Sequence, residues 1–368
     1  MIKQLEIENF RCFGKSTLSG FERVNLIGGQ NNSGKTAFLE ALYLNCSPRA
    51  ETVMKLRGIT KEIMMTFPER AWDGLFLNHN NQINAKVTSD VDVQQEKPTL
   101  SLSCNFLSAK SKHPEEQLFE LVKSKELDND EFIAFKDIFT NSENLLSILN
   151  VSFSTEKYRN TSLILATKGM YKVIERNGNF QQISFISATE KAPAQYLAQQ
   201  YDKSYFKGYA DKINEAFNIV DPSIREVRTL MSGDTLYLSR KNQRPMSIAL
   251  FGDAMNRVAH FALELINNQA GILLIDEIEN GIHHSHQKQL WQWLFALAVE
   301  LDVQIFATTH SLEMLTAFKE AAMGTQYESE AAYSEFARHV KTGEIISIKR
   351  EIDNLDYALS RDKEIRGE

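Results

Sequence analysis

The sequence predicts an α/β protein in which a mixed sheet is flanked by helices and interrupted by an inserted α+β lobe. Two observations predict it. An apolar strand at 24–28 passes through a glycine-rich segment into a helical pattern at 36–44. Two further apolar strands, 271–276 and 303–308, alternate with helical patterns. Apolar strands that alternate with helices are typical of a mostly parallel sheet covered on both faces.

The N-terminal segment is expected to form strand, turn, strand, glycine-rich loop and helix. Apolar and polar residues alternate over 2–10, which predicts an edge-like strand. Gly14 marks the turn, and Gly28 and Gly29 end the second strand.

The middle of the chain is less regular, and we interpret it as the inserted lobe. Its apolar patterns predict four strands and one charged helix, at 83–91, 100–106, 162–167 and 170–175 for the strands and 113–149 for the helix. No heptad pattern is sustained, so a long coiled-coil arm is not expected. The predicted division is therefore 1–50 and 183–368 as two halves of one nucleotide-binding domain, with 51–182 inserted between them.

The second half returns to strong periodicity. Helices are expected at 194–217, 255–266 and 285–301, and a strand with a turn at 232–234 is expected over 229–238.

Composition restricts the class of protein. The 368 residues are 43% hydrophobic, which is enough for a large core. A net charge of -7 is not the footprint of a chain that binds nucleic acid tightly by itself. Five basic residues could still form a local patch, namely Arg225, Arg228, Arg240, Lys241 and Arg244. A solvent-exposed charged surface is the simpler explanation of these residues.

No apolar run reaches the ~20 residues of a membrane span, and the N-terminus lacks the apolar stretch of a secretory signal. The 3 cysteines are widely spaced, which favours reduced thiols. We expect a cytoplasmic protein with no membrane partner.

The strongest motif is the segment GGQNNSGKT at 28–36, which fits G-x-x-x-x-G-K-[ST]. Its glycines let backbone N–H groups surround phosphate oxygens, and the following helix points its positive end at them. Lys35 is expected to neutralise the β- and γ-phosphates of ATP, and the Thr36 hydroxyl to ligate Mg²⁺. The expected ATP-binding residues of this loop are Gly29, Asn31, Asn32, Ser33, Gly34, Lys35, Thr36 and Ala37.

A second motif follows the apolar strand at 271–276. Adjacent side chains of a strand point to opposite sides, so Asp276 and Glu277 cannot share one role. Asp276 is expected to hold Mg²⁺ through water, and Glu277 to act as the general base for the attacking water. His310 follows the next buried strand and is placed to bridge that water, Glu277 and the γ-phosphate.

These motifs, in this order and separated by a long insertion, resemble an ABC/SMC-type P-loop ATPase head. More narrowly, EIENFRCF (6–13), NNSGKT (31–36), IDEIENGIHH (275–284) and ATTHS (307–311) resemble the OLD-like ATPases, relatives of RecF found in bacterial phage defence. The resemblance covers about 1–48 and 183–320, and no motif in the middle belongs to it.

The resemblance implies further residues of the site. Asn9, Phe10 and Arg11 would lie near the base and sugar of ATP, Glu277 would be the catalytic base, and His310 the switch histidine. Gly252 and Asp253 fall in the signature loop that would close on the ATP of a second subunit, which implies a homodimer or higher oligomer.

The signature loop departs from the usual form, because Phe251 stands where a phosphate-binding serine is expected. Ser247, or backbone amides at Gly252 and the helix start, are the alternatives for that contact. The glutamine of the lid loop has no clear counterpart, and Gln82 is only a candidate.

Two possible metal centres are not expected. His283, His284 and His286 lack a carboxylate or cysteine partner at fixed spacing, so a helix start is the simpler explanation. The nucleases of the OLD family carry a Toprim domain with a Glu and a DxD cluster, and the 58 residues after His310 contain no DxD. We therefore expect no intrinsic nuclease.

Three functional hypotheses remain. The first is an ATPase that controls a separate effector, a nuclease or toxin, in an anti-phage defence complex. The second is a RecF-like repair ATPase that binds DNA, and the third is the ATP subunit of a transporter. Phe251 and the long insertion argue against the third.

Overall fold

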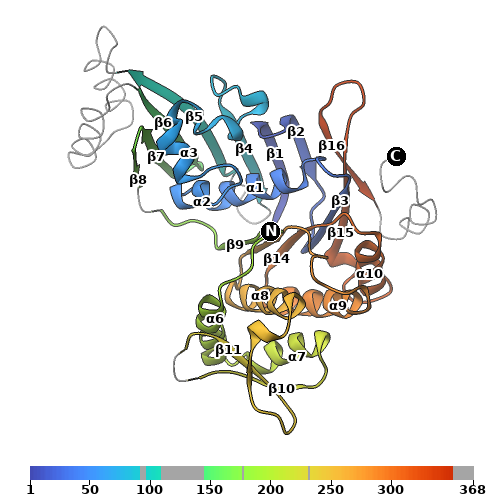
Figure 1. Cartoon of the computed structure of the whole chain (residues 1–368). Helices are drawn as coiled ribbons and strands as arrows, with labels where there is room; N and C mark the ends of the chain where they lie inside the picture. The colour runs from blue at the N-terminus through green and yellow to red at the C-terminus, as the bar shows by residue number, and fades with distance from the viewer. Residues whose placement is uncertain (92–96, 109–144, 176–177, 231–232, 351–368) are drawn as a thin grey trace.

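The computed structural model describes residues 1–91, 97–108, 145–175, 178–230 and 233–350 (Figure 1). The predicted mostly parallel sheet is present as a six-stranded sheet in the order β16-β15-β3-β14-β13-β9. Its strands are β3 Val24–Gly29, β9 Ile183–Ile186, β13 Ile272–Ile275, β14 Gln304–Thr308, β15 Ala331–Arg338 and β16 Ile345–Arg350. Only β16 pairs antiparallel with its neighbour, so the sheet is mixed, as expected.

Helices cover both faces of this sheet, and the alternation of strand side chains decides which face each residue joins. Leu273 and Ile275 pack in one core with α8 Asp253–Asn267, α9 His284–Glu300 and α10 Leu312–Ala322. Ile272 and Leu274 pack in the other core with α1 Lys35–Cys46. All four side chains are fully buried, which explains the uninterrupted apolar sequence of β13.

A second, seven-stranded sheet lies above the first in Figure 1. All its neighbouring strands pair antiparallel, in the order β2-β1-β4-β5-β6-β7-β8. The strands are β1 Ile2–Phe10, β2 Phe13–Ser19, β4 Ala85–Val91, β5 Thr99–Ser108, β6 Leu145–Ser154, β7 Arg159–Thr167 and β8 Met170–Ile174. The strands of 51–182 thus continue the sheet that β1 and β2 begin.

The prediction that β1 is an edge strand is wrong. β1 pairs with β2 on one side and β4 on the other. Its alternating sequence reflects an antiparallel sheet with one face in the core, where Ile2, Leu5, Ile7 and Phe10 are fully buried.

A helical block and a small sheet lie below the central sheet in Figure 1. They comprise α6 Ala194–Phe206, α7 Ala210–Val220 and the three-stranded sheet of β10 Ile224–Thr229, β11 Leu236–Arg240 and β12 Met246–Ser247. The single helix predicted over 194–217 is two helices, because Gly208 adopts a φ of 86° between them. The strand predicted over 229–238 is likewise parts of two strands, the end of β10 and the start of β11, and residues 231 and 232 between them lie outside the described residues.

Short helices complete the described chain: α2 Ala50–Met54, α3 Lys61–Thr66, η1 Pro68–Arg70, η2 Asp73–Leu75, η3 Leu77–His79, η4 Ile248–Leu250 and η5 Glu328–Glu330. Of the helix predicted over 113–149, residues 145–149 belong to β6 and the rest lies outside the described residues. No helix in the described ranges is long and apolar enough to cross a membrane.

Candidate nucleotide site

The glycine-rich loop lies between β3 and α1, as its motif predicts. Gly29 has a φ of 133°, and a Cβ at this position would collide with the carbonyl oxygen of Phe336 on β15. Gly34 caps α1 with a φ of 93°. Both conformations favour glycine, and they turn the chain so that the N-terminus of α1 opens toward the loop.

Lys35 is nearly buried, at 9% exposure. Its Nζ donates to the carbonyl oxygens of Gly29 at 2.7 Å and Gln30 at 2.8 Å. Burial lowers the pKa of Lys35, and the negative charges of Asp276, Glu279 and Glu277 oppose that shift. The loop therefore holds a desolvated cation where the phosphates of a nucleotide are expected.

Asp276 contacts two hydroxyl groups. The Thr36 hydroxyl donates to its Oδ1 and Oδ2 at 3.1 and 3.0 Å, and the Thr308 hydroxyl donates to Oδ1 at 2.6 Å. Neighbouring ligands of an octahedral Mg²⁺ are about 2.9 Å apart, given Mg–O distances of about 2.0–2.1 Å. The hydroxyl and carboxylate oxygens of this pair fit Mg²⁺, held directly by Thr36 and directly or through water by Asp276.

We expect Asp276→Asn to raise the Mg²⁺ concentration needed for half-maximal ATP hydrolysis by about tenfold or more, because one charged oxygen near the ion is lost. ATP binding without metal should change little. A titration of initial rate against Mg²⁺ measures the shift, with Asp302→Asn on the exposed surface as control. An unchanged Mg²⁺ requirement would contradict the assignment.

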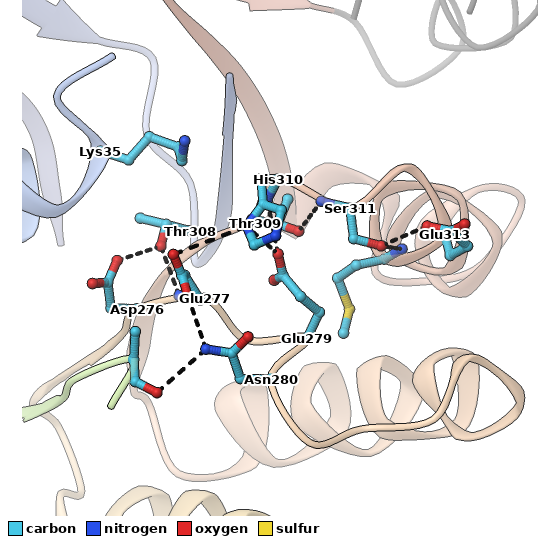
Figure 2. A network of polar contacts seen from close by, with 12 residues as sticks. Lys35, Asp276, Glu277, Glu279, Asn280, Thr308, Thr309, His310, Ser311 and Glu313 are labelled. Carbon is cyan, nitrogen blue, oxygen red and sulfur yellow. Dashed lines mark hydrogen bonds and ion pairs between the residues drawn. The ribbon is translucent and has the colours of Figure 1, made fainter. Parts of the chain in front are cut away.

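Glu277 starts the turn after β13, with a φ of 49°. Its backbone N–H donates to the Thr308 hydroxyl at 2.9 Å, and its Oε2 accepts from Asn280 Nδ2 at 2.8 Å (Figure 2). The left-handed backbone turns Glu277 to a different side from Asp276. The two carboxylates therefore occupy separate places, as their two predicted roles require.

His310 lies closer to Glu279 than to the predicted base. Its Nδ1 is 3.0 Å from Glu279 Oε1 and 4.0 Å from Glu277 Oε1. The same Glu279 oxygen accepts from the His310 backbone N–H at 2.8 Å. The sequence motifs do not single out Glu279 or Asn280, although both follow Asp276 and Glu277 within 3 positions.

A cavity of about 360 Å³ adjoins the loop and His310. Its walls come from the loop, from the segment after β14 and from β15, namely Gly28, Gly29, Gln30, Asn31, Thr309, His310, Ser311, Leu312, Leu315 and Tyr333. The structure thus brings the predicted loop, Asp276, Glu277 and His310 to one end of the central sheet.

The three residues expected near the base and sugar have protein partners of their own in this structure. Phe10 is fully buried in the core, and the Asn9 amide donates to the carbonyl of Ile83 at 2.6 Å. Arg11 forms an ion pair with Glu40 of α1, with Nε 3.0 Å from Oε2. Phe10 therefore cannot stack on a base in this conformation.

We expect Arg11→Ala to lower the free energy of unfolding by about 3 kcal/mol, because the Glu40 side chain has no solvent exposure and would keep only its contacts to Arg57. Urea unfolding followed by circular dichroism measures the loss. Arg23→Ala, which breaks more exposed ion pairs, is the control and should cost less. Equal stability of Arg11→Ala and the native chain would show that the pair is not structural.

Gly252 caps α8 with a φ of 81° and has open space where a Cβ would be, and Asp253 beside it is exposed. Asp253 pairs with Lys191 at 2.8 Å, and that ammonium group lowers the pKa of Asp253. Phe251 is half-buried against the helical core beneath Arg240, and the Ser247 hydroxyl contacts that of Thr235 at 3.2 Å. Gly252 and Asp253 are therefore accessible parts of the predicted signature loop.

Arg257 connects α8 to the segment of Asp276 and Glu277, here called the acidic turn. Its guanidinium donates to the carbonyl oxygens of Asp276 and Ser187, both at 2.8 Å. Burial lowers the pKa of Arg257, with the charges of Asp276 and Glu277 opposing the shift. The signature loop and the acidic turn thus belong to one packed unit.

The three neighbouring histidines lie at the start of α9. The His283 ring caps this helix by accepting from the Ser285 N–H. Among the residues that the structure describes, no cluster of three or more His, Cys, Asp or Glu could hold a metal ion. Gln82, the lid-loop candidate, precedes Ile83, whose carbonyl binds Asn9.

Residues 24–316 match the family model "AAA domain, putative AbiEii toxin, Type IV TA system". An "ATP/GTP phosphatase" of Helicobacter pylori is 24% identical over 334 residues, which are 86% of each chain. The "DNA replication and repair protein RecF" of Idiomarina loihiensis is 46% identical over 43 residues, 12% of each chain.

Among solved structures, a comparison supports the fold. "Crystal structure of the SmcHead bound to the C-winged helix domain of ScpA" matches with a TM-score of 0.50 at 12% identity, over 95% of this chain and 98% of that one. The described chain thus has the SMC-head, ABC-like P-loop ATPase fold that its motifs predict.

Proposed function

The chain belongs to the AAA-domain family whose model it matches, and we propose that it hydrolyses ATP in sites shared by two copies of the chain and thereby controls a separate effector in an anti-phage defence complex. The observation that carries the ATPase part is the convergence of Lys35, Thr36, Asp276, Glu277 and His310 at one end of the central sheet.

Lys35 and the amides at the start of α1 hold the β- and γ-phosphates of ATP. Binding requires the Lys35 ammonium to leave the carbonyls of Gly29 and Gln30 for phosphate oxygens. Thr36 and Asp276 would hold Mg²⁺, which would neutralise charge on the phosphates. A desolvated lysine gains more from a phosphate than an exposed one would, because screening by water is weak.

Glu277 accepts a proton from water as the water oxygen bonds to the γ-phosphorus, and the bond from that phosphorus to the bridging oxygen of ADP breaks. Asn280 fixes Oε2 of Glu277 and leaves Oε1 to face the water. His310, held by Glu279, lines the same cavity as the glycine-rich loop and would contact the γ-phosphate. The products are ADP and inorganic phosphate.

The sharing of the site between two copies rests on the signature loop. Gly252 is not among the residues that line the cavity at the loop, it is exposed, and Leu250 before it is 74% exposed. An accessible helix N-terminus is suited to an anionic group from another molecule. We infer a head-to-head homodimer in which Gly252 and Asp253 of each copy approach the ATP of the other.

The proposed effector and defence role are supported by resemblances of the sequence. The EIENFRCF and IDEIENGIHH segments resemble the OLD-like ATPases, and the description of the matched family refers to a toxin–antitoxin system. By these resemblances, the chain would act on a separate nuclease or toxin.

The test is capture of tagged Glu277→Gln protein, expressed with its flanking genes, in ATP and Mg²⁺, followed by mass spectrometry. We expect a second protein to be captured in a stoichiometric amount with Glu277→Gln. The same protein should not be captured when Lys35→Met is the tagged variant. Recovery of the homodimer alone would contradict control of an effector while leaving the ATPase assignment intact.

A RecF-like role in DNA repair is the second candidate, favoured by the 43-residue match at 46% identity. In this case the pure protein should bind duplex DNA more tightly with ATP, and its affinity for DNA should fall steeply as the salt concentration rises. Absence of such binding by fluorescence anisotropy would exclude it.

A further inference from the structure

The far edge of the central sheet carries a second, larger cavity that the ATPase assignment does not use. Its volume is about 650 Å³, and it shares no lining residue with the cavity at the glycine-rich loop. Two strands, β14 and β13, separate β3 from β9, where this cavity lies. Cavities of this size are typical of ligand sites.

One wall of the cavity is the edge of β9. Within the part of the chain that the structure describes, β9 pairs with β13 alone and forms the end of the sheet. Both Ser184 and its neighbour Phe185 line the cavity. Adjacent side chains of a strand point to opposite faces of the sheet. A cavity that both of these side chains line must therefore lie at the edge of the strand.

The register shows which backbone groups face the cavity. The carbonyls of Gln182 and Ile186 accept from Ile272 and Asp276, at 3.0 and 2.9 Å. The even-numbered residues therefore bond to β13, and Ile183 and Phe185 direct their N–H and C=O groups outward. A row of outward donors and acceptors is a template for another extended segment.

Another part of the lining is acidic. Glu264 of α8 is 8% exposed, its Oε1 accepts from the Tyr196 hydroxyl, and that oxygen is 3.8 Å from His260 Nε2. Glu190 also lines the cavity. Lys55, which lines it too, has its ammonium 2.7 Å from Glu51.

The other groups at Glu264 do not neutralise it. Burial lowers the pKa of His260, which keeps its ring neutral, although Glu264 opposes the shift. Burial, together with the charge of Glu264, raises the pKa of Tyr196, so the phenol stays protonated and donates. A nearly buried carboxylate is most stable beside a positive partner.

We propose that this cavity binds an extended peptide segment of a partner protein, which pairs with the edge of β9 and places a lysine or arginine side chain on Glu264. β9 has four residues, Ile183–Ile186, so the paired segment is about as short. Specificity comes from the basic side chain and affinity from the strand pairing.

The site is connected to the ATPase centre through short contacts. The Asp276 N–H bonds to the Ile186 carbonyl of β9, and Arg257 joins the carbonyls of Ser187 and Asp276. Arg257 and His260 are three positions apart on α8, and Glu264 follows one turn later, so they share one side of the helix. A bound peptide would thus lie one strand from the Asp276 carboxylate.

The test uses the full chain and a positional-scanning library of fluorescent, acetylated pentapeptide amides, measured by anisotropy. We expect selection of lysine or arginine at one position and of β-branched residues two positions away. N-methylation of alternate amides of the best peptide should abolish binding, since it removes the strand pairing.

Glu264→Gln should weaken the best peptide at least tenfold (about 1.4 kcal/mol), while Glu62→Gln on the exposed face of α3 should not change it. Thermal unfolding of each variant shows that it is folded. Four results would each overturn the proposal: no pool binds at about 1 mM, no basic residue is selected, N-methylation has no effect, or agmatine alone binds as tightly as the peptides.

Discussion

Glu277→Gln should lower the rate of ATP hydrolysis by about 10²–10⁴-fold while ATP remains bound. The amide keeps the size of the side chain and its contact with Asn280, but it cannot accept a proton from water. Single-turnover hydrolysis and filter binding of labelled ATP separate the two effects.

The matched control is Glu62→Gln, which changes the same chemical group at an exposed position of α3. Its rate should equal that of the native chain. Turnover of Glu277→Gln above one tenth of the native rate would assign the base elsewhere, with Glu279 beside His310 as the next carboxylate to test.

Lys35→Met should weaken ATP binding by about 100-fold, equivalent to ~3 kcal/mol. The methionine fills similar space but offers no charge to the phosphates. Isothermal titration calorimetry with ATP and Mg²⁺ measures this loss. Native-like affinity would remove Lys35 from the phosphate site.

The same variant should not lose stability in the absence of nucleotide, because it removes a desolvated ammonium group. The pKa of Lys35 is lower in the folded chain than in the unfolded chain, so between these two values the unfolded chain binds more protons. Lys35 therefore makes the free energy of unfolding of the native chain increase as pH rises through that window toward 10.5. Lys35→Met should not show this increase. Thermal unfolding at neutral and alkaline pH measures both effects.

The parts of the site that the sequence predicts are those in which one short segment determines the geometry. The loop at 29–36 and the Asp276–Glu277 pair each follow an apolar strand, and the strand fixes where their side chains point. The contacts of Arg11 could not be predicted, because Glu40 is 29 positions away and its burial depends on how α1 packs.

The sequence predicts the fold best where apolar strands alternate with helices. It does not predict β15, because Ser334 and Glu335 interrupt the apolar pattern of this strand, although both are buried. Glu335 pairs with Arg350 of β16, and this partner becomes apparent only once the hairpin is formed. The position of β1 inside a sheet depends on β4, which lies more than 70 positions later in the chain.

A mixing experiment tests whether each ATP site is built from two copies of the chain, as we propose. Lys35→Met disables the phosphate loop, and Gly252→Glu places a charged side chain on the signature loop where φ is 81°. Each variant alone should be inactive, and a mixture should regain hydrolysis, because a mixed dimer contains one intact loop facing one intact signature. If Gly252→Glu alone hydrolyses ATP at the native rate, or the mixture stays inactive while native gel analysis shows mixed dimers, the shared site is contradicted.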